Sequence, residues 1–272
     1  MSKFIIAAVQ MHSTADKAEN LKNIAAAFEE AAQRGAKVVA FPETMEYSGT
    51  EGAANAEYIP SGDCCQLLCA LAKKHGMWAL GTIHERTDEN PKPYNTTFVV
   101  NPEGEVVSKY CKLHLSDMHF PGANLESNTM AAGNKLVVYD TGDYGVFGLS
   151  ICYDIRFGEM YRLMTLKGAN ILFTPASFYM NTGMNHWEAI LRTRAIENGC
   201  YLVAPAQCGQ KHNYTAYGKS MIIDPWGNVL ACASERPCVI TAEVDLDYVP
   251  VARNQSSTLF NLRPDCYTLK EN

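Results

Sequence analysis

Lys37-Val38-Val39-Ala40-Phe41-Pro42 is a short strand whose side chains are apolar on both faces. A strand that bordered water would alternate apolar and polar residues, so this pattern is typical of a strand covered on both sides. The stretch therefore predicts a layered α/β fold in which helices cover sheets.

The sequence on either side alternates helical and strand patterns, as a layered fold requires. Upstream, Ala15–Gln33 has apolar residues at helical spacing, and Gly35 ends that helix. Downstream, Cys64–His75 is a predicted helix that ends at Gly76, and Met77–His84 is the next strand. The other predicted elements are strands Phe4–Val9, Thr97–Asn101, Glu105–Tyr110, Lys135–Asp140, Val146–Cys152, Asn170–Thr174, Tyr201–Ala206, Lys219–Asp224, Val229–Ala233 and Val239–Val244, and helices Phe157–Lys167 and Asn185–Asn198.

Periodicity alone does not distinguish one doubly wound sheet from two stacked sheets. No repeat, low-complexity tract or Pro/Gly/Ser linker divides the 272 residues, so we expect a single domain over residues 1–272. The composition, with 47% hydrophobic and 19% charged residues, predicts a sizeable core.

Charge and hydropathy argue against nucleic-acid and membrane partners. The formal charge is −6, and the lysines and arginines are scattered rather than gathered in a basic patch. No apolar stretch approaches the roughly 20 residues that span a bilayer. Met1–Gln10 lacks the long apolar core and cleavage site of a signal peptide, so we expect a cytoplasmic protein.

The ten cysteines fit the same compartment. Their spacing is irregular, and Cys69, Cys200 and Cys232 lie within apolar runs, which indicates reduced and mostly buried thiols. Cys64, Cys65 and Cys69 lack the CxxC spacing of a zinc or redox site, so packing is their expected role.

Three predicted strands are followed by a residue with useful chemistry. Glu43 follows Phe41-Pro42, Lys112 follows the strand ending near Tyr110, and Cys152 ends the strand that begins at Val146. Sites in α/β proteins assemble at strand ends. We therefore expect these three side chains to be candidates for one site.

Each of the three residues also has an ordinary explanation when taken alone. Cys152 precedes a strand-to-helix turn, where a thiol can lie beside backbone N–H groups, but free cysteines are often buried and inert. Glu43 can act as a base if it is desolvated, or it can be a solvated loop residue. Lys112 can stabilise an oxyanion, or it can be a surface lysine like Lys109.

The combination is more specific than its parts. Phe41–Met45, Lys109–Leu115 and Gly148–Phe157 resemble, in order and in spacing, the three signature blocks of the nitrilase, or carbon–nitrogen hydrolase, superfamily. The likeness extends across the chain and includes Pro175–Phe178 and Gly218–Gly227. It implies a four-layer α-β-β-α sandwich and a Glu-Lys-Cys triad that works without a metal or organic cofactor.

By position, the resemblance assigns the base to Glu43, the oxyanion partner to Lys112 and the nucleophile to Cys152. The backbone N–H of Tyr153 is expected to help hold the oxyanion. A thioester would form on the cysteine and then be hydrolysed.

Two further implications follow from the same resemblance. Members carry a second glutamate in the stretch matching Pro121–Ser127, and Glu126 falls there, so it is expected to orient Lys112 and the substrate. Members also pair through the helix after the cysteine and the helix after Pro175–Ser177. We therefore expect a homodimer or a higher homo-oligomer.

The residues after the nucleophile indicate the substrate. Tyr153-Asp154 followed by Ile-Arg-Phe resembles the amidase branch of omega-amidases and deaminated-glutathione amidases, which cut small amides of carboxylic or 2-oxo acids to acid and ammonia. Ser116 and His119-Phe120 depart from that branch near the expected pocket wall. Hydrolysis of N-carbamoyl amines remains open, and hydrolysis of nitriles, which Tyr153-Asp154 disfavours, is the other alternative.

Arg156 is the candidate clamp for a substrate carboxylate, because a guanidinium forks onto that group. The alternative is a structural ion pair with Asp154 or Glu159. Other side chains expected to line the pocket are Tyr47, Phe178 and Thr182.

Other classes of function are less well supported. The five-residue spacing of His114 and His119 does not place both on one helical face, so we expect no metal site. For His186-Trp187 we expect packing. A binding module with a dead site would lack a triad member, and all three are present. The expected partner is therefore a small-molecule amide.

Overall fold

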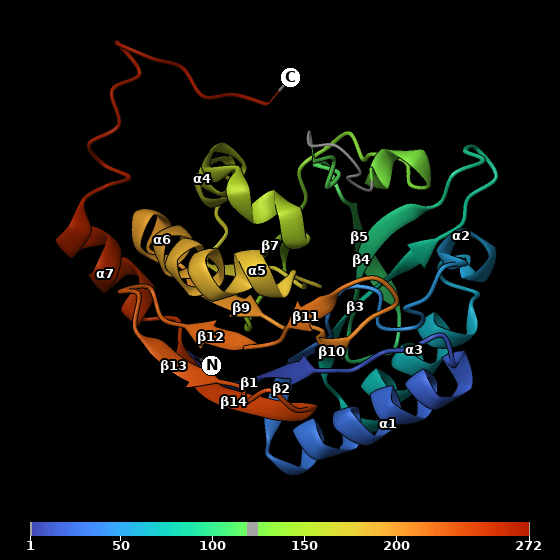
Figure 1. The fold of residues 1–272 in the computed structure, drawn as a ribbon. Coiled ribbons are helices and arrows are strands. Elements are labelled where there is room, and N and C mark those ends of the chain that lie inside the picture. Colours follow the sequence, from blue (N-terminus) through green and yellow to red (C-terminus); the bar gives the residue numbers. More distant parts are fainter. Residues whose placement is uncertain (1, 119–124, 272) are drawn as a thin grey trace.

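The strands form two six-stranded sheets, as Figure 1 shows for the computed structural model, which describes residues 2–118 and 125–271. The first sheet has the order β14 (Cys238–Asp245), β1 (Lys3–Gln10), β2 (Ala36–Ala40), β3 (Trp78–Glu85), β4 (Tyr94–Val100), β5 (Val106–Cys111). The second has the order β13 (Val229–Cys232), β12 (Met221–Ile223), β9 (Tyr201–Ala204), β8 (Ile171–Phe173), β7 (Val146–Leu149), β6 (Val138–Asp140). A third, two-stranded sheet joins β10 (Cys208–Gln210) and β11 (Thr215–Tyr217).

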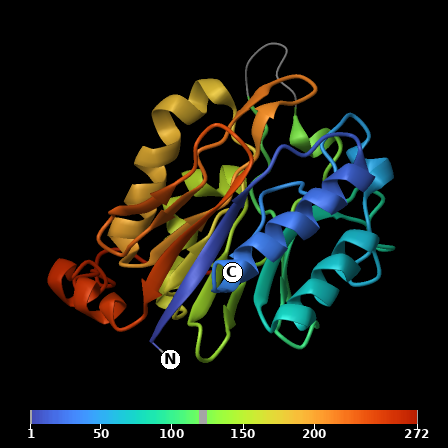
Figure 2. The same ribbon diagram turned by 90° about the horizontal axis from the view of Figure 1, so that it is seen from below.

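Helices cover the sheets from both sides (Figures 1 and 2). Helices α1 (Lys17–Gln33) and α3 (Asp63–His75) pack on the first sheet, and α4 (Gly158–Leu166) and α6 (Glu188–Asn198) pack on the second. The arrangement is the α-β-β-α sandwich that the resemblance implied. The remaining helices are α2 (Gly52–Asn55), η1 (Glu126–Asn128), η2 (Cys152–Arg156), α5 (Met180–Thr182), η3 (Gly183–Trp187) and α7 (Tyr248–Ser256). Within the described ranges, none of the helices has the length and apolar character needed to cross a membrane.

The alternation of side chains along β1 explains why its strand pattern is apolar on both faces. Ala7 and Val9 belong to the core under α1 and α3, whereas Ile6 and Ala8 belong to the core between the sheets. Successive side chains of a strand point to opposite faces, so a strand in the middle of a sandwich needs apolar residues throughout.

Aromatic side chains join the two sheets. Phe147 of β7 is fully buried and contacts Trp78 of β3 edge-on, with 6.2 Å between the ring centroids. On its own sheet it contacts Phe173 at 4.8 Å. Phe147 therefore contributes directly to the packing of the first sheet against the second.

Most predicted boundaries agree with the structure, and the exceptions have local causes. The helix predicted at Asn185–Asn198 is preceded by continuous helical turns from Met180, where Gly183 and polar residues weaken the apolar periodicity. The last predicted strand, Val239–Val244, returns to the first sheet and pairs antiparallel with β1. Strands β10 and β11, at three residues each, are too short to show alternation, and α7 was not predicted.

Replacing Phe147 with alanine should lower the free energy of unfolding by about 3–5 kcal/mol, because it empties a space between the sheets. Urea unfolding followed by circular dichroism measures the change. Leu230→Ala on β13, where the side chain is 42% exposed, is the control and should cost less than about 1 kcal/mol. Equal losses in the two variants would contradict this account of the core.

Candidate active site

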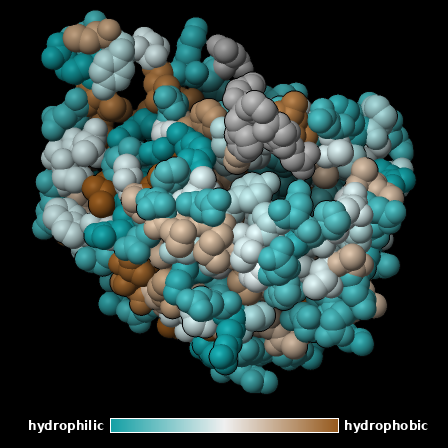
Figure 3. Space-filling model, viewed as in Figure 1, coloured by the Kyte–Doolittle hydropathy of each residue, from teal (hydrophilic) through white to brown (hydrophobic). Residues whose placement is uncertain are grey.

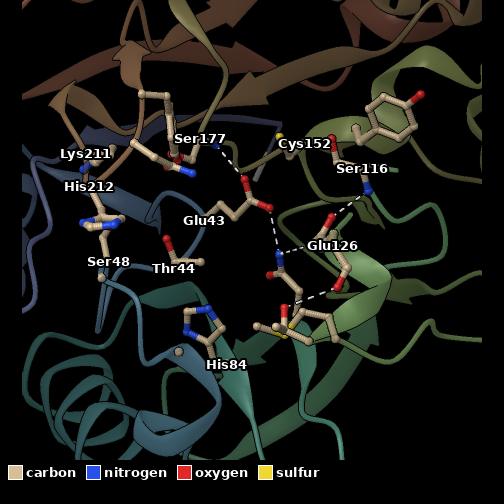
Figure 4. A pocket seen from close by; sticks show the side chains of 18 of the residues that line it. Glu43, Thr44, Ser48, His84, Ser116, Glu126, Cys152, Ser177, Lys211 and His212 are labelled. Carbon is tan, nitrogen blue, oxygen red and sulfur yellow. Dashed lines mark hydrogen bonds between the residues drawn. The ribbon is translucent and has the colours of Figure 1, made fainter. Parts of the chain in front are cut away.

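A cavity of about 630 Å³ lies at the ends of the strands and is lined by Glu43, Lys112, Glu126 and Cys152. Figure 4 shows Glu43, Glu126 and Cys152 at this cavity. The four side chains come from stretches far apart in the sequence, and the fold brings them to one place. The other residues expected at the site also line the cavity: Tyr47, Tyr153, Arg156, Phe178 and Thr182.

Glu43 reaches the cavity because the chain turns sharply after β2. The N–H of Phe41 still donates to the Leu80 carbonyl at 2.9 Å, as in a strand. Thr44, directly after Glu43, has a φ of 52°, which is a strained value for a residue with a side chain. Only 5% of Glu43 remains exposed, so its carboxylate is largely removed from water.

Cys152 lies in a second strained turn, directly after β7. Its φ is 49°, and its own N–H donates to the Pro175 carbonyl at 2.9 Å. The buried carboxylate of Asp154 accepts from the N–H of Ile151 at 2.8 Å and so closes the turn around the cysteine. The turn is thus fixed on both sides of Cys152, which is 9% exposed.

Asp154 is held in turn by residues of the β5 stretch. Its carboxylate accepts from the Tyr110 hydroxyl at 2.6 Å and from the N–H of His114 at 3.0 Å. The ring Nδ1 of His114 lies 2.8 Å from the same carboxylate, and the ring stacks on Phe157 at 3.6 Å. His114 therefore supports the cysteine turn, while His119 and Phe120 lie outside the described residues.

The central feature of the site is a buried ammonium between two carboxylates. Nζ of Lys112 donates to Oε1 of Glu43 at 3.0 Å and to Oε2 of Glu126 at 2.9 Å. The lysine side chain is 2% exposed, and those of Glu43 and Glu126 are 6% and 19% exposed. At such burial an unpaired charge would be strongly destabilising, so the ammonium and the carboxylates depend on one another.

Three neutral N–H donors also bind the carboxylates of Glu43 and Glu126, and sequence reasoning did not assign them this role. The side-chain amide of Asn95 donates to Oε1 of Glu43 at 2.7 Å, and the N–H of Ser177 donates to Oε2 at 2.7 Å. The N–H of Ser116 donates to Oε2 of Glu126 at 2.7 Å. The one available signal was Asn95 itself, an amide side chain near the start of β4.

Electrostatics in the cavity follow from burial and from these pairs. Burial alone lowers the pKa of Lys112, but the charges of Glu126 and Glu43 outweigh it and raise the pKa well above its ordinary value. Burial alone raises the pKa of Glu126, but Lys112 outweighs it and lowers the pKa. Lys112 therefore remains a cation and Glu126 an anion at neutral pH.

The thiol of Cys152 responds to the same groups. Its pKa is raised well above the ordinary value, first by burial and then by the charge of Glu43, while Lys112 and the N–H of Ser177 lower it. The resting cysteine is therefore a neutral thiol. Any reaction through its sulfur needs a base in the cavity.

Arg156 lines the cavity and does not form either of the ion pairs considered as alternatives. Its guanidinium lies over the rings of Tyr153 and Phe178, at 5.5 and 5.2 Å from their centroids. Nη1 is 3.4 Å from the ring of His186. The alternative of a structural pair with Asp154 or Glu159 is wrong, since within residues 2–118 and 125–271 the guanidinium pairs with neither carboxylate.

The predicted packing role is confirmed for Trp187, Cys64 and Cys65. It is wrong for His186, which is exposed beside Arg156, and Cys69 is only partly buried. Trp187 is 1% exposed, and its indole N–H donates to the Lys219 carbonyl at 2.8 Å. Cys64 and Cys65 are fully buried beneath the first sheet. In the part of the chain that the structure describes, no cluster of three His, Cys, Asp or Glu residues is arranged to hold a metal ion.

The fold and the cavity together define a hydrolase with a sheltered cysteine, carboxylate and ammonium. A family model described as carbon-nitrogen hydrolase matches residues 5–254. The chain belongs to the carbon-nitrogen hydrolase family, and it is an enzyme that acts on carbon–nitrogen bonds other than peptide bonds.

The chain is also similar to individual proteins, which include two amidases and one protein of known structure. The chain is 39% identical to the deaminated glutathione amidase of Bos taurus over 272 residues, which covers 97% of this chain and 83% of that one. It is 38% identical to an omega-amidase of Xenopus laevis, over 100% of this chain and 99% of the other. The crystal structure of the Caenorhabditis elegans NitFhit protein superposes with a TM-score of 0.93 at 36% identity, covering 100% of this chain and 68% of that one.

Replacing Glu126 with glutamine should destabilise the protein by about 1–3 kcal/mol at neutral pH, because it removes a buried charge that Lys112 needs. The folded-state pKa of Glu126 lies below its ordinary value of 4.5. Its contribution is therefore present above that value and is lost as the pH falls through the folded-state pKa.

Urea unfolding at a series of pH values from about 7 down to about 3.5 measures this difference. The gap between the original protein and Glu126→Gln should narrow toward the acid end. A gap that stays constant or widens there would contradict the ion pair.

Proposed function

We propose that Cys152 is the nucleophile, Glu43 the general base and Lys112 the oxyanion partner of an amidase. The observation that carries the proposal is the ammonium–carboxylate pair at 3.0 Å, buried in the same cavity as a neutral thiol. A neutral thiol requires a base, and Glu43 is the carboxylate whose charge acts most strongly on the thiol pKa.

In the acylation step, Glu43 takes the thiol proton as the sulfur attacks the amide carbonyl. The carbon–sulfur bond forms, and the oxyanion accepts hydrogen bonds from the Lys112 ammonium and the N–H of Tyr153. Glu43 then returns the proton to the leaving nitrogen, so that ammonia departs and a thioester remains. The raised pKa of Lys112 keeps it a cation throughout.

In the deacylation step, water enters the position that ammonia has left. Glu43 takes a proton from that water, which adds to the thioester carbonyl. The carbon–sulfur bond then breaks, Glu43 returns the proton to the sulfur, and the acid leaves. Glu126 accepts two hydrogen bonds from Lys112, at 3.1 and 2.9 Å. We assign it the role of holding the ammonium toward the oxyanion.

For the substrate, we propose a small amide that carries a carboxylate, such as the omega-amide of a dicarboxylic or 2-oxo acid. The names of the bovine and frog relatives support this choice. Arg156 supports it as well, because its guanidinium lines the cavity without an acidic partner among the described residues. Tyr47, Phe178 and Thr182 form further parts of the wall.

We also propose a homodimer and a reducing compartment such as the cytoplasm. Apolar side chains are exposed on the helices expected to pair, with Leu166 of α4 at 49% and Ile196 of α6 at 45%. In Figure 3, which shows the face with these helices, apolar side chains are interspersed with hydrophilic ones. All ten cysteines are free, which favours a compartment that keeps thiols reduced.

Replacing Cys152 with alanine should lower amide turnover by more than about 10³-fold while leaving the fold intact, because the nucleophile is lost. Ammonia release measures turnover, and circular dichroism checks the fold. Cys232→Ala is the matched control, since that thiol is exposed on β13 and does not line the cavity. Substantial turnover by a folded Cys152→Ala protein would overturn the proposal.

A panel of omega-amides of 2-oxo acids, N-carbamoyl amines and nitriles tests the reaction class. The amides should give the highest kcat/KM for ammonia release. Arg156 lines the same cavity as Glu43, Lys112 and Cys152, and its guanidinium can bind the carboxylate of an omega-amide. A protein that releases ammonia from carbamoyl amines or nitriles alone would favour the corresponding alternative reaction.

A further inference from the structure

The hydroxyl groups of Tyr214 and Ser177 form a short hydrogen bond at the wall of the cavity. Their oxygens are 2.5 Å apart, and both residues line the cavity. Burial raises the pKa of Tyr214, so its hydroxyl keeps its proton at neutral pH. The pair is therefore a neutral contact beside the reacting groups, and it takes no part in the steps above.

The backbone of Ser177 acts on both the base and the nucleophile. Its N–H donates to Oε2 of Glu43 at 2.7 Å, and Figure 4 shows this hydrogen bond. The same N–H acts on Cys152, where burial is the largest influence and raises the thiol pKa, while the N–H is one of the groups that lower it. A change in the orientation of this peptide group would therefore affect the direction of the base and the loss of the thiol proton.

Tyr214 lies in the turn between β10 and β11, and hydrogen bonds close that turn. The N–H of Lys211 donates to the Tyr214 carbonyl at 2.7 Å, and the side-chain amide of Gln210 donates to the same carbonyl at 3.1 Å. The ring of Tyr214 packs on that of Tyr179, with 4.4 Å between the centroids. The Tyr214 hydroxyl thus has a fixed position from which it can hold Ser177.

A second set of contacts connects the same turn to Glu43. Lys211 is buried, and its Nζ donates to Oε1 of Gln207 at 2.8 Å and to the Ser13 carbonyl at 2.9 Å. Nε2 of Gln207 in turn donates to the Glu43 carbonyl at 3.0 Å. The turn between β10 and β11 therefore reaches the backbone of Glu43 through Gln207 and its carboxylate through Ser177.

From these contacts we propose that Tyr214 is a positioning residue, whose hydroxyl holds Ser177 so that the Ser177 N–H stays directed at Glu43 and Cys152. The inference rests on the proposed amidase function and adds to it a residue outside the three signature blocks. Tyr214 acts through Ser177 and not through the substrate. Loss of its hydroxyl should therefore slow the chemical steps and leave substrate binding nearly unchanged.

Two variants each remove one hydroxyl of the pair and keep the backbone N–H of Ser177, namely Tyr214→Phe and Ser177→Ala. Ammonia release from succinamate measures kcat and KM. In each variant kcat should fall by about 10-fold, as expected for one lost hydrogen bond, and KM should change by less than about 2-fold. The double variant should be no slower than either single variant, because all three lose the same interaction.

Alkylation of Cys152 by iodoacetamide provides a measurement that needs no turnover. Its rate follows the thiolate fraction, and mass spectrometry of the Cys152 peptide separates this thiol from the other cysteines. A less well directed Ser177 N–H stabilises the thiolate less and so raises the thiol pKa. Tyr214→Phe should therefore shift the pH profile of the alkylation rate to higher pH.

Tyr201→Phe is the matched control for loss of a tyrosine hydroxyl. That hydroxyl accepts from the Asp245 N–H at 3.0 Å, and Tyr201 lies outside the set of described residues that line the cavity. Its removal should leave kcat and the alkylation profile unchanged. Circular dichroism checks the fold of each variant, and Tyr214→Phe alone decides the outcome if Ser177→Ala fails to fold.

An unchanged kcat or an unchanged alkylation profile in Tyr214→Phe would overturn the proposal. So would losses of kcat that multiply in the double variant, or a rise in KM at constant kcat, which would indicate that Tyr214 binds the substrate directly. Absence of ammonia release by the unmodified enzyme would instead count against the proposed function, and the alkylation profile would still decide the role of Tyr214.

Discussion

The ammonium of Lys112, enclosed between Glu43 and Glu126, is the interaction on which the rest of the site depends. Two carboxylates this deeply buried would repel each other and lose their charges without it. The ammonium nitrogen lies 3.0 Å from Glu43 and 2.9 Å from Glu126, so it places a positive charge beside each buried carboxylate. The neutral donors Asn95 and Ser177 then fix the direction of that carboxylate without cancelling its charge.

The members of this arrangement come from both sheets, and strained turns set the directions of Glu43 and Cys152. Glu43 follows β2 of the first sheet, whereas Cys152 follows β7 of the second, and each lies at or beside a residue with positive φ. Asp154, buried beneath the cysteine turn, joins that turn to the β5 stretch that also carries Lys112. Strain at the two turns is maintained because the surrounding hydrogen bonds leave the backbone no other conformation.

Much of this arrangement could be predicted from the sequence, and what could not be predicted has physical causes. Runs such as Val38-Val39-Ala40 predict covered strands, but each run is equally apolar in one sheet or in two. Periodicity therefore could not predict the partition into two sheets, which came from the family resemblance alone. The candidate residues of the cavity were found through their side-chain chemistry. The N–H of Ser177 carries no such signal, because it is a backbone group that every residue except proline has.

The hydrogen bond from the Ser177 N–H to Glu43 has a wider consequence, because it crosses from one half of the sandwich to the other. The stretch that holds Ser177 continues from β8, while Glu43 continues from β2. A small slip of one sheet past the other would leave every helix and strand formed and yet turn the base away from the sulfur. Heating or a destabilised core should therefore abolish the activity of this protein while its helices and strands are still formed.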